Sequence, residues 1–355
     1  MRVCINLRDQ DFSNTKSIGI YNVAIGLTRA FAEDERITKL ILLINSSLTE
    51  TFEELQANNK IEIVGCSEEA PRGWRRLLWD QWGLVRGVRQ LDVDWLILPK
   101  GFPPLLLWFK VKVCSYIHDN IFQCYAAMGW SGISIVEKCY FSWCYRRAVQ
   151  KADLIVTNSQ FTLDELISSG RKMVAKKVGI GFEPNVDLPT DAEERSGILV
   201  FISPHPHKLS KQSIAWLKRW KKQTGNRSKI YGVGCMPDNA HWPEGSDWEM
   251  TPRLSEAEMM GLWRKVKVLV YFSAYEGFGM PPCEAIRKGV IPLASDIPPH
   301  RENLSNEFLF SNDDYQSFAS RLNDALENMK PPVDHLATWQ DVGNSMVSAM
   351  VKCRE

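Results

Sequence analysis

Short apolar runs alternate along the chain with longer segments in which apolar residues recur every three or four positions. The short runs have the length of buried strands, and the longer segments have the spacing of helices that cover one face of a sheet. The runs that predict strands are residues 2–7, 39–45, 61–64, 95–98, 111–117, 152–157, 197–202, 229–233 and 268–272. Strands that alternate with helices in this way are typical of parallel sheets covered on both faces. The pattern therefore predicts an α/β fold.

The length of 355 residues predicts two domains, because a single core of that size is uncommon. Residues 179–197 are rich in glycine, proline and charged side chains, which is typical of a linker. We therefore expect a first domain over residues 1–185 and a second over residues 186–337.

The composition narrows the class of protein. Forty-three basic and forty-two acidic residues give a net charge of +1, so no bulk field favours nucleic acid. The nine cysteines are scattered and include no Cys-x-x-Cys pair, which favours reduced thiols over a disulfide framework or a zinc site. No apolar run approaches the roughly 20 residues of a spanning helix. We expect a cytoplasmic protein, with peripheral attachment to a membrane as the alternative.

The stretch at residues 268–296 carries the clearest chemical signal. It joins a strand, a loop with Gly277 and Gly279, and a helix that opens with two prolines. The first N–H groups of a helix lack internal partners and carry the positive end of its dipole, so they favour a phosphate. Glu276 and Glu284 flank this place and are suited to accept hydrogen bonds from sugar or ribose hydroxyls. The spacing of the two glutamates alone is also typical of an ordinary solvated edge.

The wider context of these glutamates decides between the two interpretations. The sequence Glu-Gly-Phe-Gly-Met-Pro-Pro-Cys-Glu-Ala at residues 276–285 closely resembles the signature of the family-4 retaining glycosyltransferases, in the glycogen-synthase-like superfamily. The resemblance implies the GT-B fold, in which two doubly wound Rossmann-like domains face each other across a cleft. The second domain is then expected to hold a nucleotide-sugar donor and the first an acceptor. The helix at residues 338–352 is expected to return to the first domain.

The resemblance also implies roles for the residues of this stretch. Glu276 is expected to contact the transferred sugar, and Glu284 the ribose of the nucleotide. The residues expected to surround the sugar and the diphosphate with their backbone are Gly277, Phe278, Gly279 and Met280.

His118 and Lys208 each follow a predicted strand, where open α/β sheets bind their ligands. By the resemblance, His118 lies close to the donor sugar, and the alternative is a structural histidine. Lys208 stands just ahead of a helix and is suited to pair with the diphosphate. The family usually has a second cation beside this lysine, where the present chain has His207. We take His118, Lys208 and Glu276 as the candidate catalytic residues.

Gly19 lies at the opening of the first predicted helix. In the family a glycine-containing loop at this place faces the diphosphate of the donor, so Gly19 is a candidate for donor binding. The family usually has a glycine pair here, whereas this chain has Ile18 before Gly19.

The implied reaction moves a hexose from a nucleoside-diphosphate sugar to a hydroxyl, with retention at the anomeric carbon. The acceptor is expected to be a glycan or a polyprenyl-linked glycan. GDP-mannose is the first choice of donor, because residues 118–119, 157–162 and 276–279 resemble bacterial-type polysaccharide mannosyltransferases. A UDP-hexose donor, an epimerase of the same fold, and a non-catalytic nucleotide- or glycan-binding protein are the alternatives.

No metal cofactor is expected. Lys208 and a helix N-terminus can neutralise the diphosphate without one. The pair Asp92 and Asp94 has the spacing of a metal-binding motif, but it precedes a strand instead of following one.

Residues 72–89, which begin at Arg72 and end at Arg89, combine five arginines with three tryptophans. Aromatic rings favour the membrane interface and guanidinium groups pair with phosphates, so this segment suits a membrane surface or a polyprenyl-phosphate acceptor. Its apolar residues also have helical spacing, which predicts instead a helix that packs five of them inward, namely Trp74, Leu77, Leu78, Trp82 and Val85, with the arginines in solvent. The sequence leaves both interpretations open.

Overall fold

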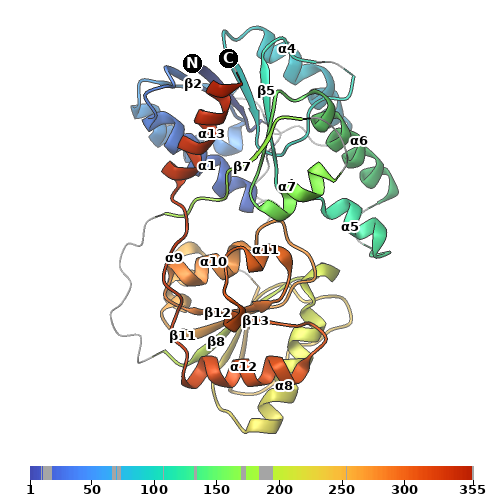
Figure 1. Ribbon diagram of the computed structural model, residues 1–355, viewed down its shortest axis with the longest axis vertical. Coiled ribbons are helices and arrows are strands. Elements are labelled where there is room, and N and C mark those ends of the chain that lie inside the picture. Colours follow the sequence, from blue (N-terminus) through green and yellow to red (C-terminus); the bar gives the residue numbers. More distant parts are fainter. Residues whose placement is uncertain are drawn as a thin grey trace. The chain divides into compact units, whose positions relative to one another are not determined.

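The structure is a computed structural model that describes residues 1–8, 10, 18–65, 69, 73–106, 108–131, 134–168, 173–183, 195–252 and 254–353. The chain forms two compact units (Figure 1). Unit 1 comprises Met1–Ala126, Ile133–Glu183 and Ala337–Glu355, and unit 2 comprises Ala127–Gly132 and Pro184–Leu336. The chain therefore leaves unit 1 and returns to it for its last helix.

The described part of unit 1 is built on a seven-stranded parallel sheet with the order β3-β2-β1-β4-β5-β6-β7. Its strands are β1 (Arg2–Asn6), β2 (Lys39–Leu43), β3 (Ile61–Val64), β4 (Trp95–Leu98), β5 (Lys112–Ile117), β6 (Leu154–Thr157) and β7 (Ala175–Lys177). Its helices are α1 (Ile18–Glu33), α2 (Thr49–Glu53), α3 (Gly73–Leu78), α4 (Leu84–Arg89), α5 (Ile121–Ala127), α6 (Ile135–Lys151), α7 (Gln160–Ile167) and α13 (Trp339–Lys352). A π-helical turn (Trp79–Gly83) joins α3 to α4, and short 3-10 turns (Ser46–Leu48, Glu54–Ala57) flank α2.

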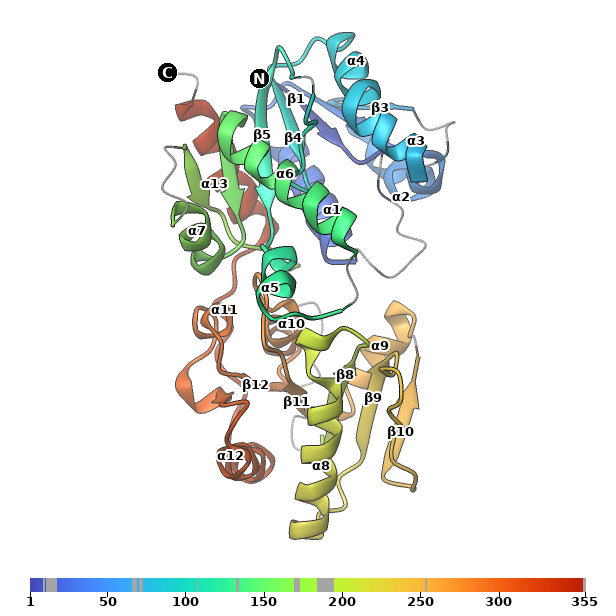
Figure 2. The ribbon, with the colours of Figure 1, turned by 90° about the vertical axis from the view of Figure 1, so that its right-hand side faces the viewer.

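Helices α3, α4 and α6 cover one face of this sheet, and α1 and α13 cover the other (Figure 2). On the first face, the buried side chains of Leu84, Val85 and Val88 in α4 join the core of β4 and β5. The strands are apolar on both sides, because each face of the sheet is covered. β4, for example, is buried at every position.

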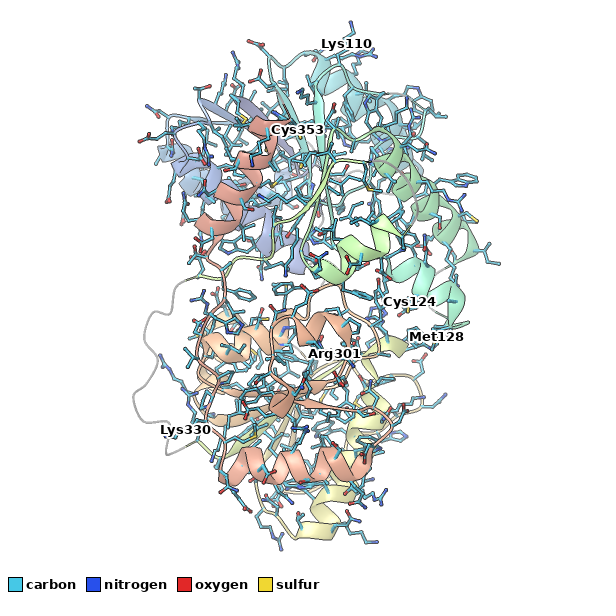
Figure 3. The ribbon with its side chains drawn as sticks, in the orientation of Figure 1. Lys110, Cys124, Met128, Arg301, Lys330 and Cys353 are labelled. Atoms are coloured by element: carbon cyan, nitrogen blue, oxygen red, sulfur yellow. The ribbon has the colours of Figure 1, made fainter. Side chains whose placement is uncertain are left out.

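The last helix, α13, is held closely against α1. The indole of Trp339 lies on the backbone of Gly26 and Gly181, where a Cβ on either glycine would collide with it. At the far end of α13, the Lys112 ammonium of β5 donates a hydrogen bond to the carbonyl oxygen of Cys353 (Figure 3). Small residues at the contact therefore allow the two helices to approach, as packing at a helix crossing requires.

The described part of unit 2 contains a six-stranded parallel sheet with the order β10-β9-β8-β11-β12-β13. Its strands are β8 (Gly197–Ile202), β9 (Ile230–Gly234), β10 (Trp248–Thr251), β11 (Val266–Tyr271), β12 (Ile291–Ser295) and β13 (Leu309–Phe310). Its helices are α8 (Ser210–Thr224), α9 (Glu256–Trp263), α10 (Met280–Arg287), α11 (Pro298–Arg301) and α12 (Tyr315–Glu327), with short turns η6 (Pro206–Lys208) and η7 (Asn306–Phe308). Trp220, Phe310 and Phe318 are fully buried in its core.

Both sheets change direction beside their first strand, as doubly wound sheets do. The change falls between β1 and β4 in unit 1, and between β8 and β11 in unit 2. At such a switch point the two following loops run to opposite sides and leave a crevice at the carboxyl ends of the strands, where ligands bind. The loops after β8 and β11 are therefore the expected ligand loops of unit 2.

The predicted α/β class is confirmed, but four strands were not predicted. The pattern missed the short edge strands β7, β10 and β13, of three, four and two residues, and also β12, a buried strand inside the sheet of unit 2. Leu78 and Trp82 are 45% and 46% exposed, so the prediction that they are buried is wrong, whereas Val85 is fully buried. The side chains of Trp74 and Leu77 lie outside the described residues. None of the helices in the described ranges is long and apolar enough to cross a membrane.

Candidate active site

Two loops of unit 2 bring a lysine, a glutamate and a tyrosine together at the ends of β8 and β11. Lys208 ends the turn η6 after β8, Tyr271 ends β11, and Glu276 lies in the loop that follows. The Lys208 ammonium donates hydrogen bonds to Oε1 of Glu276 at 2.6 Å and to the Tyr271 hydroxyl at 2.8 Å. The Tyr271 hydroxyl donates to the same Oε1 at 2.7 Å. Two residues predicted separately from the sequence are therefore in direct contact at the switch point.

The charges of this cluster stabilise each other. The side chains of Lys208 and Glu276 are only 24% and 13% exposed. Burial by itself raises the pKa of Glu276, but the Lys208 ammonium outweighs burial and lowers that pKa to about 2. Burial by itself lowers the pKa of Lys208, and the negative charge of Glu276 raises it above its ordinary value. The pair is therefore ionised at neutral pH, and Glu276 is too weak a base to abstract a proton.

Tyr271 was not identified from the sequence. Its ring lies under the Lys208 ammonium, 5.3 Å from Nζ, and its hydroxyl joins the two charged groups. Burial and the negative charge of Glu276 raise the pKa of Tyr271, so the hydroxyl stays protonated and acts as a donor. The available signal was its position as the last residue of a buried strand, where a side chain can point to the ligand edge.

Glu284 is the fifth residue of α10 and is half-buried. Burial raises the pKa of its carboxyl group, and Lys288 partly opposes this effect. No group in the described residues donates a hydrogen bond to this carboxylate. A partly buried carboxylate without donors is unfavourable, so the hydroxyl groups of a bound molecule would stabilise it.

Helix α10 begins without a side-chain cap. Its N-cap is Gly279, whose φ of +88° lies in the left-handed region that glycine adopts without strain. Helix α8 also begins without a side-chain cap, at Leu209, whose φ is +48°. By contrast, Ser255 and Asp314 cap α9 and α12 with side-chain oxygens. Two uncapped helix N-termini therefore lie beside Lys208 at adjacent strand ends, an arrangement that suits an anion.

His300 of α11 packs against the loop that carries Glu276, and no role was predicted for it. It is 1% exposed, and its Nδ1 lies 2.7 Å from the carbonyl oxygen of Ser295. Burial lowers the pKa of His300, so the ring is neutral and Nδ1 donates this hydrogen bond. A Cβ on Gly279 would lie 2.5 Å from the ring of His300, and the ring of Tyr271 lies 5.7 Å from it. His300 thus supports both the Gly279 turn and Tyr271.

A hydrogen-bond network fixes the two ligand loops against each other. The backbone N–H of Ser273 donates to Oγ of Ser295 at 2.8 Å, and that hydroxyl donates to Oδ1 of Asn312 at 2.7 Å. The side-chain amide of Asn312 donates back to the carbonyl oxygen of Ser273 at 3.0 Å. The N–H of Ala274 donates to the carbonyl oxygen of His207 at 2.7 Å. Lys208 and Glu276 are therefore held by neighbours that are themselves positioned.

His207 does not supply the second cation that the family usually has at this place. Its side chain is buried, and burial together with the neighbouring Lys208 lowers its pKa to about 3, so the ring is neutral. Its ring stacks on that of His205 at 5.7 Å. Within the described ranges no group of three or more histidine, cysteine, aspartate or glutamate side chains could hold a metal ion.

In unit 1, His118 directly follows β5, as predicted. Its Nε2 lies 2.6 Å from the carbonyl oxygen of Pro99, which follows the neighbouring strand β4, and its ring meets that of Tyr116 edge to face at 4.4 Å. Burial lowers the pKa of His118 to about 4, although the hydrogen bond to Pro99 opposes this effect. The ring is therefore neutral at physiological pH and is held in one orientation at the ligand edge of its sheet.

Gly19 is the second residue of α1. The loop before this helix, residues 11–17, lies outside the described residues. The role of Gly19 in binding a diphosphate stays a prediction.

Comparison with known proteins places this arrangement in context. Residues 22–177 match the family described as Glycosyltransferase Family 4, and residues 245–336 match the family described as Glycosyl transferases group 1. An O-antigen chain mannosyltransferase of Salmonella typhimurium, RfbU, is 25% identical over 222 residues, which cover 59% of this chain and 60% of that protein. The chain thus matches less than two thirds of the length of this relative.

Solved structures with the same fold cover both units. The lipopolysaccharide outer core galactosyltransferase WaaB superposes with a TM-score of 0.64 at 12% identity and covers 99% of each chain. HepE of Anabaena, solved with UDP and glucose, gives a TM-score of 0.64 at 13% identity, covering 100% of this chain and 98% of its own. At these identities the likeness concerns the fold.

Proposed function

Because the chain belongs to the family-4-like glycosyltransferases with the GT-B fold, we propose that it transfers a hexose from a nucleotide sugar to a hydroxyl group of a glycan or lipid-linked acceptor, with retention of anomeric configuration. The observation that carries the proposal is the contact of Lys208, Glu276 and Tyr271 at the switch point of unit 2. A cation, a fixed carboxylate and two uncapped helix N-termini are what a sugar diphosphate needs.

The donor is bound in this proposal by groups of unit 2. The diphosphate lies at the N-terminus of α10, where the backbone of Gly277, Phe278, Gly279 and Met280 approaches it, and the ammonium of Lys208 neutralises it. The ribose hydroxyls donate to Glu284, the half-buried carboxylate to which none of the described residues donates a hydrogen bond. Sugar hydroxyls donate to Glu276, whose orientation Lys208 and Tyr271 fix.

The proposed chemistry follows a front-face path. The bond from the anomeric carbon to the leaving phosphate oxygen breaks, and the bond to the acceptor oxygen forms on the same face. The acceptor proton passes to the leaving diphosphate. A covalent route needs a carboxylate nucleophile at the anomeric carbon, and Glu276 is poorly suited because Lys208 holds it in an ion pair. Lys208 and the helix N-terminus stabilise the departing charge, so we propose that no metal is required.

GDP-mannose is the proposed donor, and a UDP-hexose is the alternative. The support for mannose is that RfbU, the Salmonella relative, is a mannosyltransferase. We also propose that His118, neutral and fixed at the end of β5, contacts the donor sugar. Gly19 is proposed to approach the diphosphate.

Residues 72–89 are proposed to make peripheral contact with a membrane that holds the acceptor. The support is that Leu78 and Trp82 are about half exposed, together with the exposed arginines Arg75 and Arg86 on the same helical segment. Arg72 itself lies outside the described residues. Tryptophan and arginine side chains on one surface are suited to a lipid interface with phosphate groups.

The experiment is calorimetric titration with GDP-mannose, UDP-glucose, GDP and UDP, with and without EDTA. The variant Glu284→Gln keeps the shape of the side chain but removes its charge, and the exposed Glu327→Gln of the same unit is the matched control. We expect one nucleotide class to bind, EDTA to have no effect, and Glu284→Gln to weaken binding about tenfold or more, since hydrogen bonds to charged groups contribute about 1.5–3 kcal/mol. Binding that requires a divalent ion would refute the proposal that no metal is needed. Binding that Glu284→Gln leaves unchanged would refute the proposal that Glu284 holds the donor.

A further inference from the structure

Large apolar side chains that remain exposed in the described residues are concentrated in unit 1, mostly on or beside α3, the π-helical turn after it, and α6. Figure 2 shows α3 and α6 on one face of the sheet. Six of the ten such side chains come from this region: Leu78, Trp82, Leu106, Ile135, Val136 and Trp143. Soluble proteins normally expose such side chains singly, and a concentration of them marks an interaction surface.

Helix α6 contributes the most exposed members of this set. Ile135, Val136 and Trp143 are 79%, 78% and 58% exposed, and Cys139 and Arg146 are also exposed. Ile135 and Val136 are neighbours in the sequence, and Cys139, Trp143 and Arg146 follow at intervals of three or four residues, so the five positions form one stripe along the outer side of the helix. We call these five residues the α6 outer face.

The inner side of α6 is apolar as well, because Cys144, Tyr145, Ala148 and Val149 are buried against the sheet. A surface helix of a globular protein usually carries polar side chains on its outer side. The apolar residues of the α6 outer face are therefore not explained by packing within unit 1.

The charges of α6 are mostly positive. Helix α6 contains four basic residues and one acidic residue, Glu137. The carboxylate of Glu137 is engaged in the capping box at the start of the helix, where it accepts hydrogen bonds from the N–H and hydroxyl of Ser134 at 2.9 and 2.7 Å. Arg146 and Lys151 are exposed toward the other end. An apolar stripe with cations at its margin is complementary to an anionic lipid surface.

We propose that the α6 outer face docks on the surface of an anionic phospholipid bilayer, with Ile135, Val136 and Trp143 among the acyl chains and Arg146 at the phosphates. A second copy of this chain is the competing occupant, and the test below distinguishes it from a bilayer. The proposal goes beyond sugar transfer and beyond the contact of residues 72–89, and it stands without either.

The test is co-sedimentation of the full chain with vesicles of phosphatidylcholine alone and of phosphatidylcholine mixed with phosphatidylglycerol. A variant with Ile135→Ser, Val136→Ser and Trp143→Ser removes the apolar stripe, and Arg146→Glu removes a cation. The matched control is Ile167→Ser with Val174→Ser, which changes two apolar residues of unit 1 that are 55% and 56% exposed.

We expect binding to the anionic vesicles and little to the neutral ones. The triple variant should lower the partition coefficient at least about tenfold, because each buried apolar side chain contributes substantially to transfer from water. Arg146→Glu should weaken binding about fivefold or more and reduce its dependence on salt. The control should bind as the unchanged chain does, and all variants should keep the circular dichroism spectrum of the unchanged chain.

Three results would overturn the proposal. The first is equal binding of the triple variant and the control. The second is no binding to anionic vesicles. The third is a concentration-dependent dimer in sedimentation velocity that the triple variant abolishes, which would assign the face to a second copy. Titration of the triple variant with nucleotide sugars separates this proposal from the proposed transfer, since the α6 variants should leave donor affinity unchanged.

Discussion

Replacement of Lys208 by methionine tests the electrostatics of the active-site cluster. Methionine keeps most of the volume of the lysine stem and removes the ammonium, so Glu276 becomes a largely buried carboxylate without a counter-charge. The ion pair lowers the pKa of Glu276 from an ordinary 4.5 to about 2. Because one pKa unit corresponds to about 1.4 kcal/mol, we expect Lys208→Met to lower the free energy of unfolding of unit 2 by about 3 kcal/mol at neutral pH.

The loss should depend on pH in one direction. A carboxylate whose pKa is lower in the folded than in the unfolded chain stabilises the fold above about pH 4.5, and this contribution is lost as the pH falls toward about 2. In Lys208→Met, burial remains and raises the pKa of Glu276 above its ordinary value. The difference between the two proteins should therefore be largest at neutral pH and shrink to about 1 kcal/mol near pH 3.

The assay is urea unfolding followed by tryptophan fluorescence and circular dichroism at a series of pH values. The transitions of the two units are fitted separately, because a chain with two units need not unfold in one step. Lys330→Met, at an exposed lysine of unit 2, is the control. Adding Glu276→Gln to Lys208→Met should recover much of the loss, since both charges are then absent. A loss that is the same at every pH, or one below about 1 kcal/mol at neutral pH, would refute the reasoning.

Three further predictions concern other parts of the fold. Gly279→Ala forces a Cβ into left-handed backbone 2.5 Å from the ring of His300; it should destabilise unit 2 by about 2–4 kcal/mol in calorimetry and weaken donor binding. The control Gly225→Ala, where φ is +66° but no atom lies within 4 Å, should cost only about 1 kcal/mol. Trp339→Ala should lower the unfolding free energy of unit 1 by about 2–3 kcal/mol and leave the transition of unit 2 unchanged in urea titration. The pKa of His118 is lowered to about 4 in the folded chain, so the free energy of unfolding of unit 1 is highest above about pH 6.5 and falls as the pH drops toward 4, where the unfolded chain binds the proton more readily. Thermal melts of His118→Asn should lack that part of the pH dependence.

Sequence patterns predicted most of the central strands because these strands are buried on both faces. β12 is an exception, since Pro292 interrupts its short apolar run. β8 is a continuous apolar run and β11 contains one from Val268, and the loops after them were expected to carry ligand groups. The contact of Lys208 with Glu276 could not be predicted, because it depends on the order of the strands in the sheet. That order is set by contacts between residues far apart in the sequence.

The missed features have physical reasons as well. β10 is partly exposed and β13 has only two residues, so neither leaves a clear apolar run. His300 follows two prolines that indicate a turn, but a turn signal does not show which way the next side chain points. Trp82 was expected in the core because helical spacing reveals which residues share a face, and it does not reveal whether another element covers that face.

The packing of Trp339 against Gly26 and Gly181 has a consequence for how the chain folds during its synthesis. The sheet of unit 1 is complete once residue 177 has been made, yet the helix that covers α1 comes from the last residues of the chain. Domains generally fold as they leave the ribosome, the N-terminal one first. In this chain the first unit must wait with an apolar surface of α1 uncovered while the whole of unit 2 is synthesised. We therefore expect a chain whose translation stops before residue 339 to leave this apolar surface of α1 uncovered and to be prone to association.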